Sequence, residues 1–213
     1  MLKKLILTCL LAAAMAAPSA FAVSTVMLSD GPGNTGGGEF NATTSANGNF
    51  ATFCLEYSEH IQMGVLYYYQ ISTATTANND PISLATAWLY NQFLNGTLAN
   101  YDRSTPALHT ESANLLQRAI WFLEDEAGGD GYGGSTYVLA ALAATGVNGK
   151  TTDANGAYGV QVMNMYQNYD ANTGRFSGAK QDQIIRVPDG GTTLALLGMS
   201  MGFVALASRR MRS

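Results

Sequence analysis

The sequence predicts an α+β protein: an antiparallel β barrel or sandwich with an inserted lobe of two to three helices, and a single hydrophobic helix at the C-terminal end. Three observations predict it. Short runs of β-forming residues lie on both sides of a middle section, the middle section has the apolar period of helices, and an uncharged apolar run lies near the C-terminus. Because strands precede and follow the helices, the helices are expected to be an insertion.

The first 22 residues predict a secretory signal peptide. Lys3 and Lys4 form a basic start, an apolar run follows to Ala17, and Ala20-Phe21-Ala22 is a small-x-small cleavage site. We therefore expect three segments: a signal peptide of residues 1–22, an extracellular domain of residues 23–186 and a C-terminal sorting segment of residues 187–213.

Within the domain, the elements follow from local patterns. Asp80 and Pro81 are typical of a helix start, and apolar residues at helical spacing then continue to about Gly96. Pro106 is read as part of a linker before the second helix. The strands are expected at residues 23–28, 49–57, 65–72, 158–166 and 183–187, and the further helices from 110–112 to about 125 and at 135–145.

The C-terminal segment begins with a turn made of Val187, Pro188, Asp189, Gly190 and Gly191. Residues 192–208 form an uncharged apolar run that is just long enough for a transmembrane helix. Arg209 and Arg210 open the basic tail of residues 209–213, which fixes that end on the cytoplasmic side.

This layout of turn, apolar helix and arginine pair resembles the PEP-CTERM sorting signal in its VPDSG-type variant. The resemblance implies recognition by an exosortase, a transient anchor in the inner membrane, and delivery to the outer surface or extracellular matrix of a Gram-negative bacterium. Gly190 stands where the variant usually has serine.

The charge balance of the mature domain argues against nucleic-acid binding. Residues 23–187 contain six lysines and arginines against 14 aspartates and glutamates, a net charge of −8. Proteins that bind nucleic acids need a basic face, so we expect no such partner.

The chain has two cysteines, and Cys9 lies in the predicted signal peptide, so the exported domain holds the single thiol of Cys54. An unpaired cysteine in an exported protein calls for a chemical role. We hypothesise that Cys54 forms an internal thioester with Gln117, which lies on the second predicted helix. The apolar surround would come from Phe53, Leu55, Ile120 and Trp121. An inert buried thiol and a catalytic thiol, the latter needing His60 or His109 as a base, remain as alternatives.

The two short motifs resemble the thioester domain of bacterial surface adhesins. Phe53-Cys54-Leu55 is similar to its aromatic-Cys-apolar motif, and Leu116-Gln117 with Ile120-Trp121 is similar to its apolar-Gln-x-x-apolar-Trp motif. The resemblance implies a Cys54–Gln117 bond and covalent attachment to a surface ligand that carries an amine or hydroxyl group.

Two function classes follow. The protein is either a non-enzymatic surface protein that attaches covalently through Cys54 and Gln117, or a structural, polysaccharide-associated matrix protein with an inert cysteine. We expect no enzymatic activity, no cofactor and no metal. The acidic residues Glu124, Asp125, Glu126 and Asp130 lack the spacing of an EF-hand loop and are interpreted as the polar end of a helix.

Overall fold

A computed structural model describes residues 23–34 and 36–187. The predicted signal peptide, the transmembrane helix of residues 192–208 and the rest of the sorting segment after Val187 lie outside the described residues. None of the helices within the described ranges is long and apolar enough to cross a membrane.

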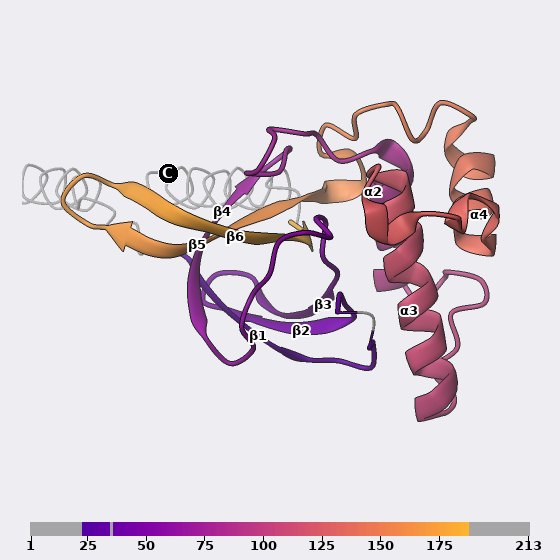
Figure 1. Cartoon of the computed structure of the whole chain (residues 1–213), viewed down its shortest axis with the longest axis horizontal. Helices are drawn as coiled ribbons and strands as arrows, with labels where there is room; N and C mark the ends of the chain where they lie inside the picture. Colours follow the sequence, from indigo (N-terminus) through magenta and orange to yellow (C-terminus); the bar gives the residue numbers. More distant parts are fainter. Residues whose placement is uncertain (1–22, 35, 188–213) are drawn as a thin grey trace, which may run out of the picture.

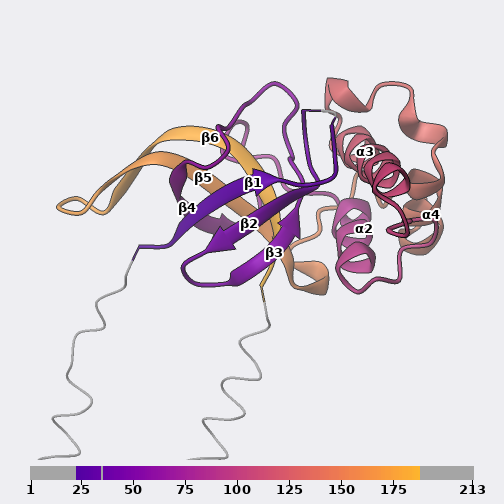
Figure 2. The same cartoon turned by 90° about the horizontal axis from the view of Figure 1, so that it is seen from below.

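All strands of the described residues belong to one antiparallel sheet with the order β3-β2-β1-β4-β5-β6 (Figure 1). The sheet is strongly curled into a half-barrel (Figure 2). The predicted α+β class is confirmed, and the alternative of a two-sheet sandwich is wrong. The strands are β1 (Thr25–Asp30), β2 (Phe40–Thr44), β3 (Gly48–Thr52), β4 (Leu66–Ser72), β5 (Val160–Asp170) and β6 (Arg175–Arg186).

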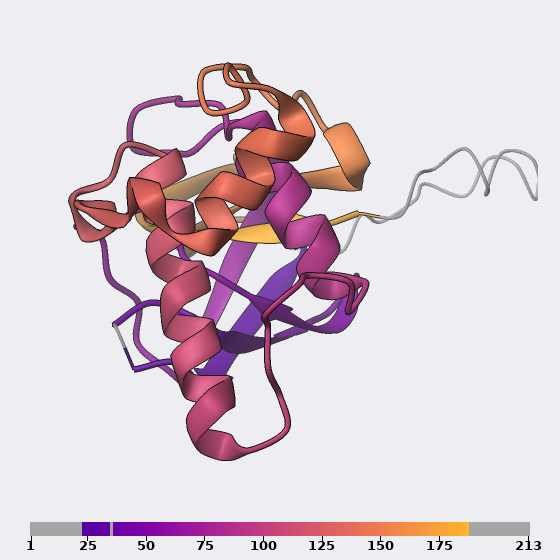
Figure 3. The same cartoon turned by 90° about the vertical axis from the view of Figure 1, so that its right-hand side faces the viewer.

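The helices α2 (Leu84–Leu94), α3 (Pro106–Leu123) and α4 (Thr136–Thr145) lie between β4 and β5 in the chain, which confirms the inserted helical lobe. They gather at one end of the sheet, on the side opposite the turn that joins β5 and β6 (Figure 1), and Figure 3 shows them in front of the sheet. The helix predicted at residues 135–145 is confirmed as α4, with Ser135 as its N-cap and Gly146 as its C-cap.

The predicted starts of the other two helices are wrong, because nearer capping residues determine them. The hydroxyl of Ser83 accepts a hydrogen bond from Thr86 N, so α2 begins after Ser83 and not at Asp80 and Pro81. The hydroxyl of Thr105 accepts one from Leu108 N, which places Pro106 in the first turn of α3 and not in a linker.

The two edges of the curled sheet meet just after β3. Leu55 N donates to Asp182 O at 3.1 Å, and Ile184 N donates to Phe53 O at 3.1 Å. These bonds make an isolated antiparallel bridge between Cys54 and Gln183. The segment that carries the cysteine therefore joins the first half of the sheet to its last strand.

Side chains alternate on the two faces of this short segment, as expected for an extended backbone. Phe53 and Leu55 belong to the core cluster that includes the helices. Cys54 belongs to a second cluster inside the curled sheet, where it packs with residues such as Tyr67 and Met163. The thiol thus lies inside the half-barrel, and its neighbours in sequence anchor the helical lobe.

Candidate functional site

Gln117 points from α3 toward the backbone of Cys54, and both residues are fully buried. Its Oε1 accepts a hydrogen bond from Cys54 N at 3.0 Å, and its Nε2 donates one to Cys54 O at 2.9 Å. The side-chain amide therefore pairs with the peptide groups of the cysteine in the manner of a neighbouring strand. The structure brings together the two residues that the sequence singled out; the covalent bond between them stays a prediction.

A third hydrogen bond to this amide comes from the glycine-rich loop that precedes β2. Gly38 N donates to Gln117 Oε1 at 2.7 Å. The loop lies so close that a Cβ atom at Gly37 would stand 2.7 Å from Cδ, Cγ and Oε1 of Gln117. A Cβ at Gly38 would stand 2.5 Å from Thr52 O. Only glycine permits this approach on both sides of the loop.

The carboxamide oxygen of Gln117 thus receives two backbone N–H groups, from Gly38 and from Cys54. Two such donors around a carbonyl oxygen form the arrangement that stabilises the tetrahedral intermediate of acyl transfer. These two donors polarise the carbonyl of Gln117, and the residue that supplies one of them also carries the sulfur of Cys54.

The sulfur itself lies in a protein environment without a strong base. Gln183 Nε2 donates a weak hydrogen bond to Cys54 Sγ at 3.5 Å, and Gln183 Oε1 is buried without a hydrogen-bond partner among the described residues. Burial raises the pKa of the Cys54 thiol to about 12. The thiol is therefore protonated at neutral pH, which argues against a catalytic thiolate.

Neither histidine supports the catalytic alternative. His60 is exposed, and His109 lies on α3 and not in a linker, which corrects the sequence interpretation. His109 Nε2 is 3.0 Å from Glu39 Oε2. In the described part of the chain, no hydrogen bond joins either histidine to Cys54.

The four apolar residues predicted around the thioester are all buried, but they divide between the two cores. Phe53, Leu55 and Ile120 pack among the helices. Trp121 alone shares the cluster that contains Cys54. Of the four predicted residues, Trp121 therefore lies in the same core as Cys54, and the other three lie in the core formed with the helices.

A buried pair of acidic residues lies one step further along the cysteine segment. Glu56 Oε2 accepts a hydrogen bond from Asp182 N at 2.8 Å, whereas Glu56 Oε1 is buried with no partner in the described residues. The Asp182 carboxylate is instead well satisfied, with donors from Thr76, Asn164 and Met165. Burial, reinforced by the charge of Asp182, raises the pKa of Glu56 from 4.5 to about 8.

This raised pKa predicts that the protein loses stability as the pH rises. The folded state holds the Glu56 proton between pH 4.5 and about 8, where the unfolded state has released it. Glu56→Gln is expected to stabilise the protein by about 1–3 kcal/mol at pH 8 and to have little effect near pH 4. Urea denaturation of both proteins at a series of pH values measures this difference. If the free energies of unfolding of the two proteins changed with pH in parallel, the prediction would be contradicted.

A surface pocket lies beside Trp121, one turn of α3 beyond Gln117. Its volume is about 310 Å³, and its lining includes Gly36, Tyr57 and Trp121. The Tyr57 and Trp121 rings meet edge to face with their centroids 5.0 Å apart. Gly36 adjoins Gly37, and Trp121 follows Gln117 by one turn of α3. The pocket is therefore open to solvent and lined by residues that lie next to Gly37 and one turn of α3 beyond Gln117.

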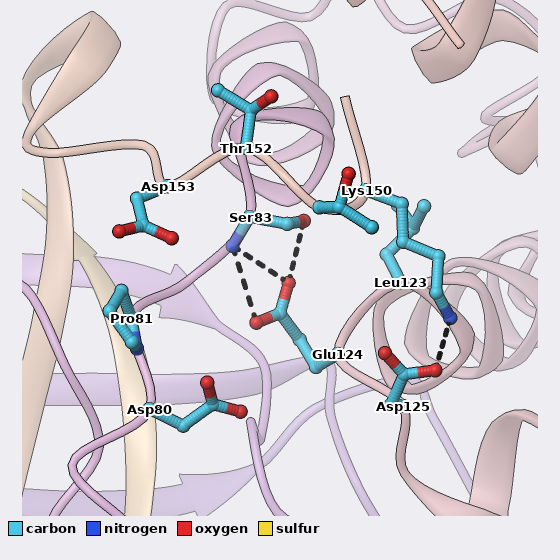
Figure 4. Close-up of a pocket in the computed structure, with 10 residues that line it drawn as sticks. Asp80, Pro81, Ser83, Leu123, Glu124, Asp125, Lys150, Thr152 and Asp153 are labelled. Carbon is cyan, nitrogen blue, oxygen red and sulfur yellow. Dashed lines mark hydrogen bonds and ion pairs between the residues drawn. The ribbon is translucent and has the colours of Figure 1, made fainter. Parts of the chain in front are cut away.

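The acidic residues at the end of α3 form a different, smaller pocket (Figure 4). Glu124 Oε1 accepts a hydrogen bond from Ser83 Oγ at 2.8 Å, and Lys150 Nζ is 2.6 Å from Asp125 Oδ1. Glu126 does not line this pocket, and its Oε2 accepts a hydrogen bond from Tyr57 N. No group of three or more metal-ligating side chains occurs in the described residues. Glu124 therefore joins the end of α3 to the start of α2, whereas Asp125 and Glu126 contact Lys150 and Tyr57.

Comparison with known proteins identifies the C-terminal segment. Residues 186–211 match the VPDSG-CTERM motif. No curated protein and no solved structure matches the chain significantly. The motif confirms the prediction of a PEP-CTERM-type tail, and it indicates an exported protein that an exosortase sorts to the cell surface. The match begins at Arg186, the last residue of β6, so the sorting segment follows the sheet directly.

Proposed function

We propose that this exported protein attaches covalently to a nucleophile at the cell surface through a thioester between Cys54 and Gln117. The observation that carries the proposal is the position of Gln117 Oε1 between Gly38 N and Cys54 N, at 2.7 and 3.0 Å. A purely structural glutamine needs partners for its amide. It does not need two backbone N–H donors on Oε1, and it does not need a cysteine whose backbone C=O accepts the hydrogen bond of Nε2.

The bond would form by attack of Cys54 Sγ on Gln117 Cδ. Negative charge then develops on Oε1, where the two N–H groups stabilise it. The C–N bond breaks, the thiol proton passes to the nitrogen, and ammonia leaves. Because the Gln117 amide is hydrogen-bonded to the peptide groups of Cys54, the two residues start side by side, and this proximity would offset the poor electrophilicity of an amide.

The product keeps its activating contacts. The acyl oxygen would remain between Gly38 N and Cys54 N, so the thioester carbonyl stays polarised for a second attack. An incoming amine that enters through the pocket beside Trp121 would form an amide with Gln117 and release the Cys54 thiol. Burial of Cys54 and Gln117 protects the bond from water until then. The nucleophile would belong to a matrix or host surface, with no enzymatic turnover.

Mass spectrometry of the exported protein, purified from its host, tests the proposal. A thioester lowers the intact mass by about 17 Da, the mass of the ammonia lost. Methylamine should then restore a free thiol at Cys54. Trypsin cleaves after Arg103 and Arg118, so the peptide of residues 104–118 reports on Gln117. That peptide should gain about 14 Da, one CH₂ group, relative to unmodified glutamine.

Two variants complete this experiment. Cys54→Ala keeps Gln117 and its hydrogen bonds but removes the sulfur, so both mass changes should disappear. Gln167→Glu, at an exposed glutamine of β5, should leave them unchanged. A wild-type protein with the full mass and a titratable Cys54 thiol after unfolding would overturn the proposal.

One observation favours the second function class, a structural matrix protein with an inert cysteine. The three hydrogen bonds of Gln117 join α3, the glycine-rich loop and the sheet closure without any covalent chemistry. In that case the peptide of residues 104–118 would have the same mass in the wild type and in Cys54→Ala, with and without methylamine.

A further inference from the structure

Gly38 supplies one of the two N–H groups on Gln117 Oε1, and a glycine has no side chain with which to hold its own peptide group. The other donor, Cys54 N, belongs to a segment that the sheet closure holds by hydrogen bonds on both sides. A displacement of about 1 Å in a group that acts on a reaction can cost about 10²-fold in rate. The residues next to Gly38 in the chain therefore decide how well its N–H is placed.

Glu39, the next residue, is anchored to the helical lobe by its side chain. The residue is only 7% exposed, and its Oε2 accepts a hydrogen bond from the Tyr101 hydroxyl. His109 Nε2 on α3 lies 3.0 Å from the same oxygen. Gln117 lies on the same helix, about two turns further along. Helix α3 therefore contacts this part of the loop twice, through Gln117 at Gly38 and through His109 at Glu39.

Tyr101 is itself held by aromatic contacts that lead back to the cysteine segment. The rings of Tyr101 and Phe93 meet edge to face with their centroids 5.0 Å apart, and Arg103 Cζ lies 4.5 Å from the centroid of the Tyr101 ring. Phe93 meets Phe53 in the same way at 5.0 Å, and Phe53 directly precedes Cys54. The loop and the cysteine segment are therefore both supported by the same group of packed rings.

A carboxyl group is a costly way to fill a buried position. Apolar residues of similar volume often replace a buried charged pair without loss of stability. Hydrogen bonds add what apolar packing lacks, which is a fixed direction and distance between Glu39 and its two partners. Burial, together with the hydrogen bond to Glu39, raises the pKa of Tyr101, so the hydroxyl keeps the proton that it donates.

We infer that Glu39 is a positioning residue, which holds the Gly38 N–H on Gln117 Oε1. Its chemical consequence rests on the thioester proposed above. As the sulfur attacks Cδ, negative charge develops on Oε1, and a fixed Gly38 donor stabilises that charge. The same donor would polarise the thioester carbonyl for the incoming amine. Glu39 acts through Gly38 and exchanges no atom or proton in either step.

Hydrogen exchange, followed by NMR, tests the placement of the donor independently of any thioester. In isotope-labelled Cys54→Ala protein, exchange of Gly38 N–H is compared with exchange of Leu55 N–H, which is bonded in the sheet closure. Glu39→Leu should speed exchange at Gly38 by about 10-fold and leave Leu55 nearly unchanged. Glu39→Gln keeps a hydrogen-bond acceptor and should restore slow exchange. Unchanged exchange at Gly38, or equal acceleration at both amides, would overturn the positioning role.

The rate of methylamine incorporation into the peptide of residues 104–118 tests the effect on the reaction. Glu39→Leu should form little thioester or react about 10- to 10²-fold more slowly than the wild type. Glu39→Gln should recover most of the rate. Tyr101→Phe removes one hydroxyl and should slow the reaction by a smaller factor, which keeps the test available if Glu39→Leu does not fold. Glu111→Leu, at an exposed position of α3, is the control and should resemble the wild type.

The outcomes distinguish this inference from the thioester proposal. A folded Glu39→Leu protein that reacts at the wild-type rate would overturn the positioning role and leave the thioester standing. A wild type with the full mass would overturn the thioester and with it the effect on the reaction. The exchange rates of Gly38 and Leu55 would then still decide whether Glu39 holds the Gly38 donor.

Discussion

Gln117→Leu is expected to lower the free energy of unfolding by about 3–9 kcal/mol, because it leaves three buried backbone groups without partners. These groups are Gly38 N–H, Cys54 N–H and Cys54 C=O, which now bond the Gln117 amide at 2.7 to 3.0 Å. Each unsatisfied buried group costs about 1–3 kcal/mol. Leucine offers a similar volume but no hydrogen bond.

The measurement is best made in a Cys54→Ala background, which holds Gln117 as a free amide and removes any covalent contribution. Urea denaturation of Cys54→Ala with and without Gln117→Leu gives the difference directly. Gln167→Leu, the same change at an exposed position of β5, is the matched control and should stay within about 0.5 kcal/mol. A loss below about 1 kcal/mol for Gln117→Leu would mean that the three backbone groups find other partners.

The helical lobe could be predicted from the sequence because its information is local. Leu116, Ile120 and Leu123 repeat at helical spacing, and all three are buried in the structure. The starts of α2 and α3 could not be placed equally well, since Pro81 and Pro106 both suit a first turn. Which proline begins a helix depends on whether a capping hydroxyl such as that of Thr105 lies just before it.

The sheet was only partly predictable, since two of its strands have little apolar content. In β2 only Phe40 and Ala42 point into the core, too few to establish an alternation. The first half of β6 lies in the exposed part of the β5–β6 hairpin. Its residues are mostly polar, so the sequence indicates a strand only near Ile184 and Ile185, at the end of β6. The closure of the sheet at Cys54 joins residues far apart in the chain and has no local pattern.

The candidate site was likewise only partly predictable from the sequence. Cys54 and Gln117 could be singled out from residue type and spacing. Gly38 could not, because a backbone N–H has no signature in the sequence. The run of glycines was the available signal: several in a row indicate a backbone that passes close to another group. Glu56 and Gln183 likewise depend on the closure of the sheet.

Gly37→Ala is expected to damage both the fold and the reaction. The new methyl carbon would stand 2.7 Å from Cδ, Cγ and Oε1 of Gln117, well inside van der Waals contact. The amide cannot simply turn away, because three hydrogen bonds hold it. Either the loop moves and withdraws Gly38 N from Oε1, or the amide moves and loses Cys54. Overpacking of this kind costs about 1–3 kcal/mol.

The effect on the reaction should be larger than the effect on stability. Loss of one donor to a developing oxyanion slows acyl transfer about 10²- to 10³-fold, so Gly37→Ala should show little thioester or methylamine incorporation at Gln117 even when fully folded. Gly134→Ala is the matched control, since a Cβ at Gly134 meets nothing within 4 Å. A folded Gly37→Ala protein that reacts like the wild type would show that the Gly38 donor is dispensable, and the oxygen of Gln117 would then owe its reactivity to Cys54 N alone.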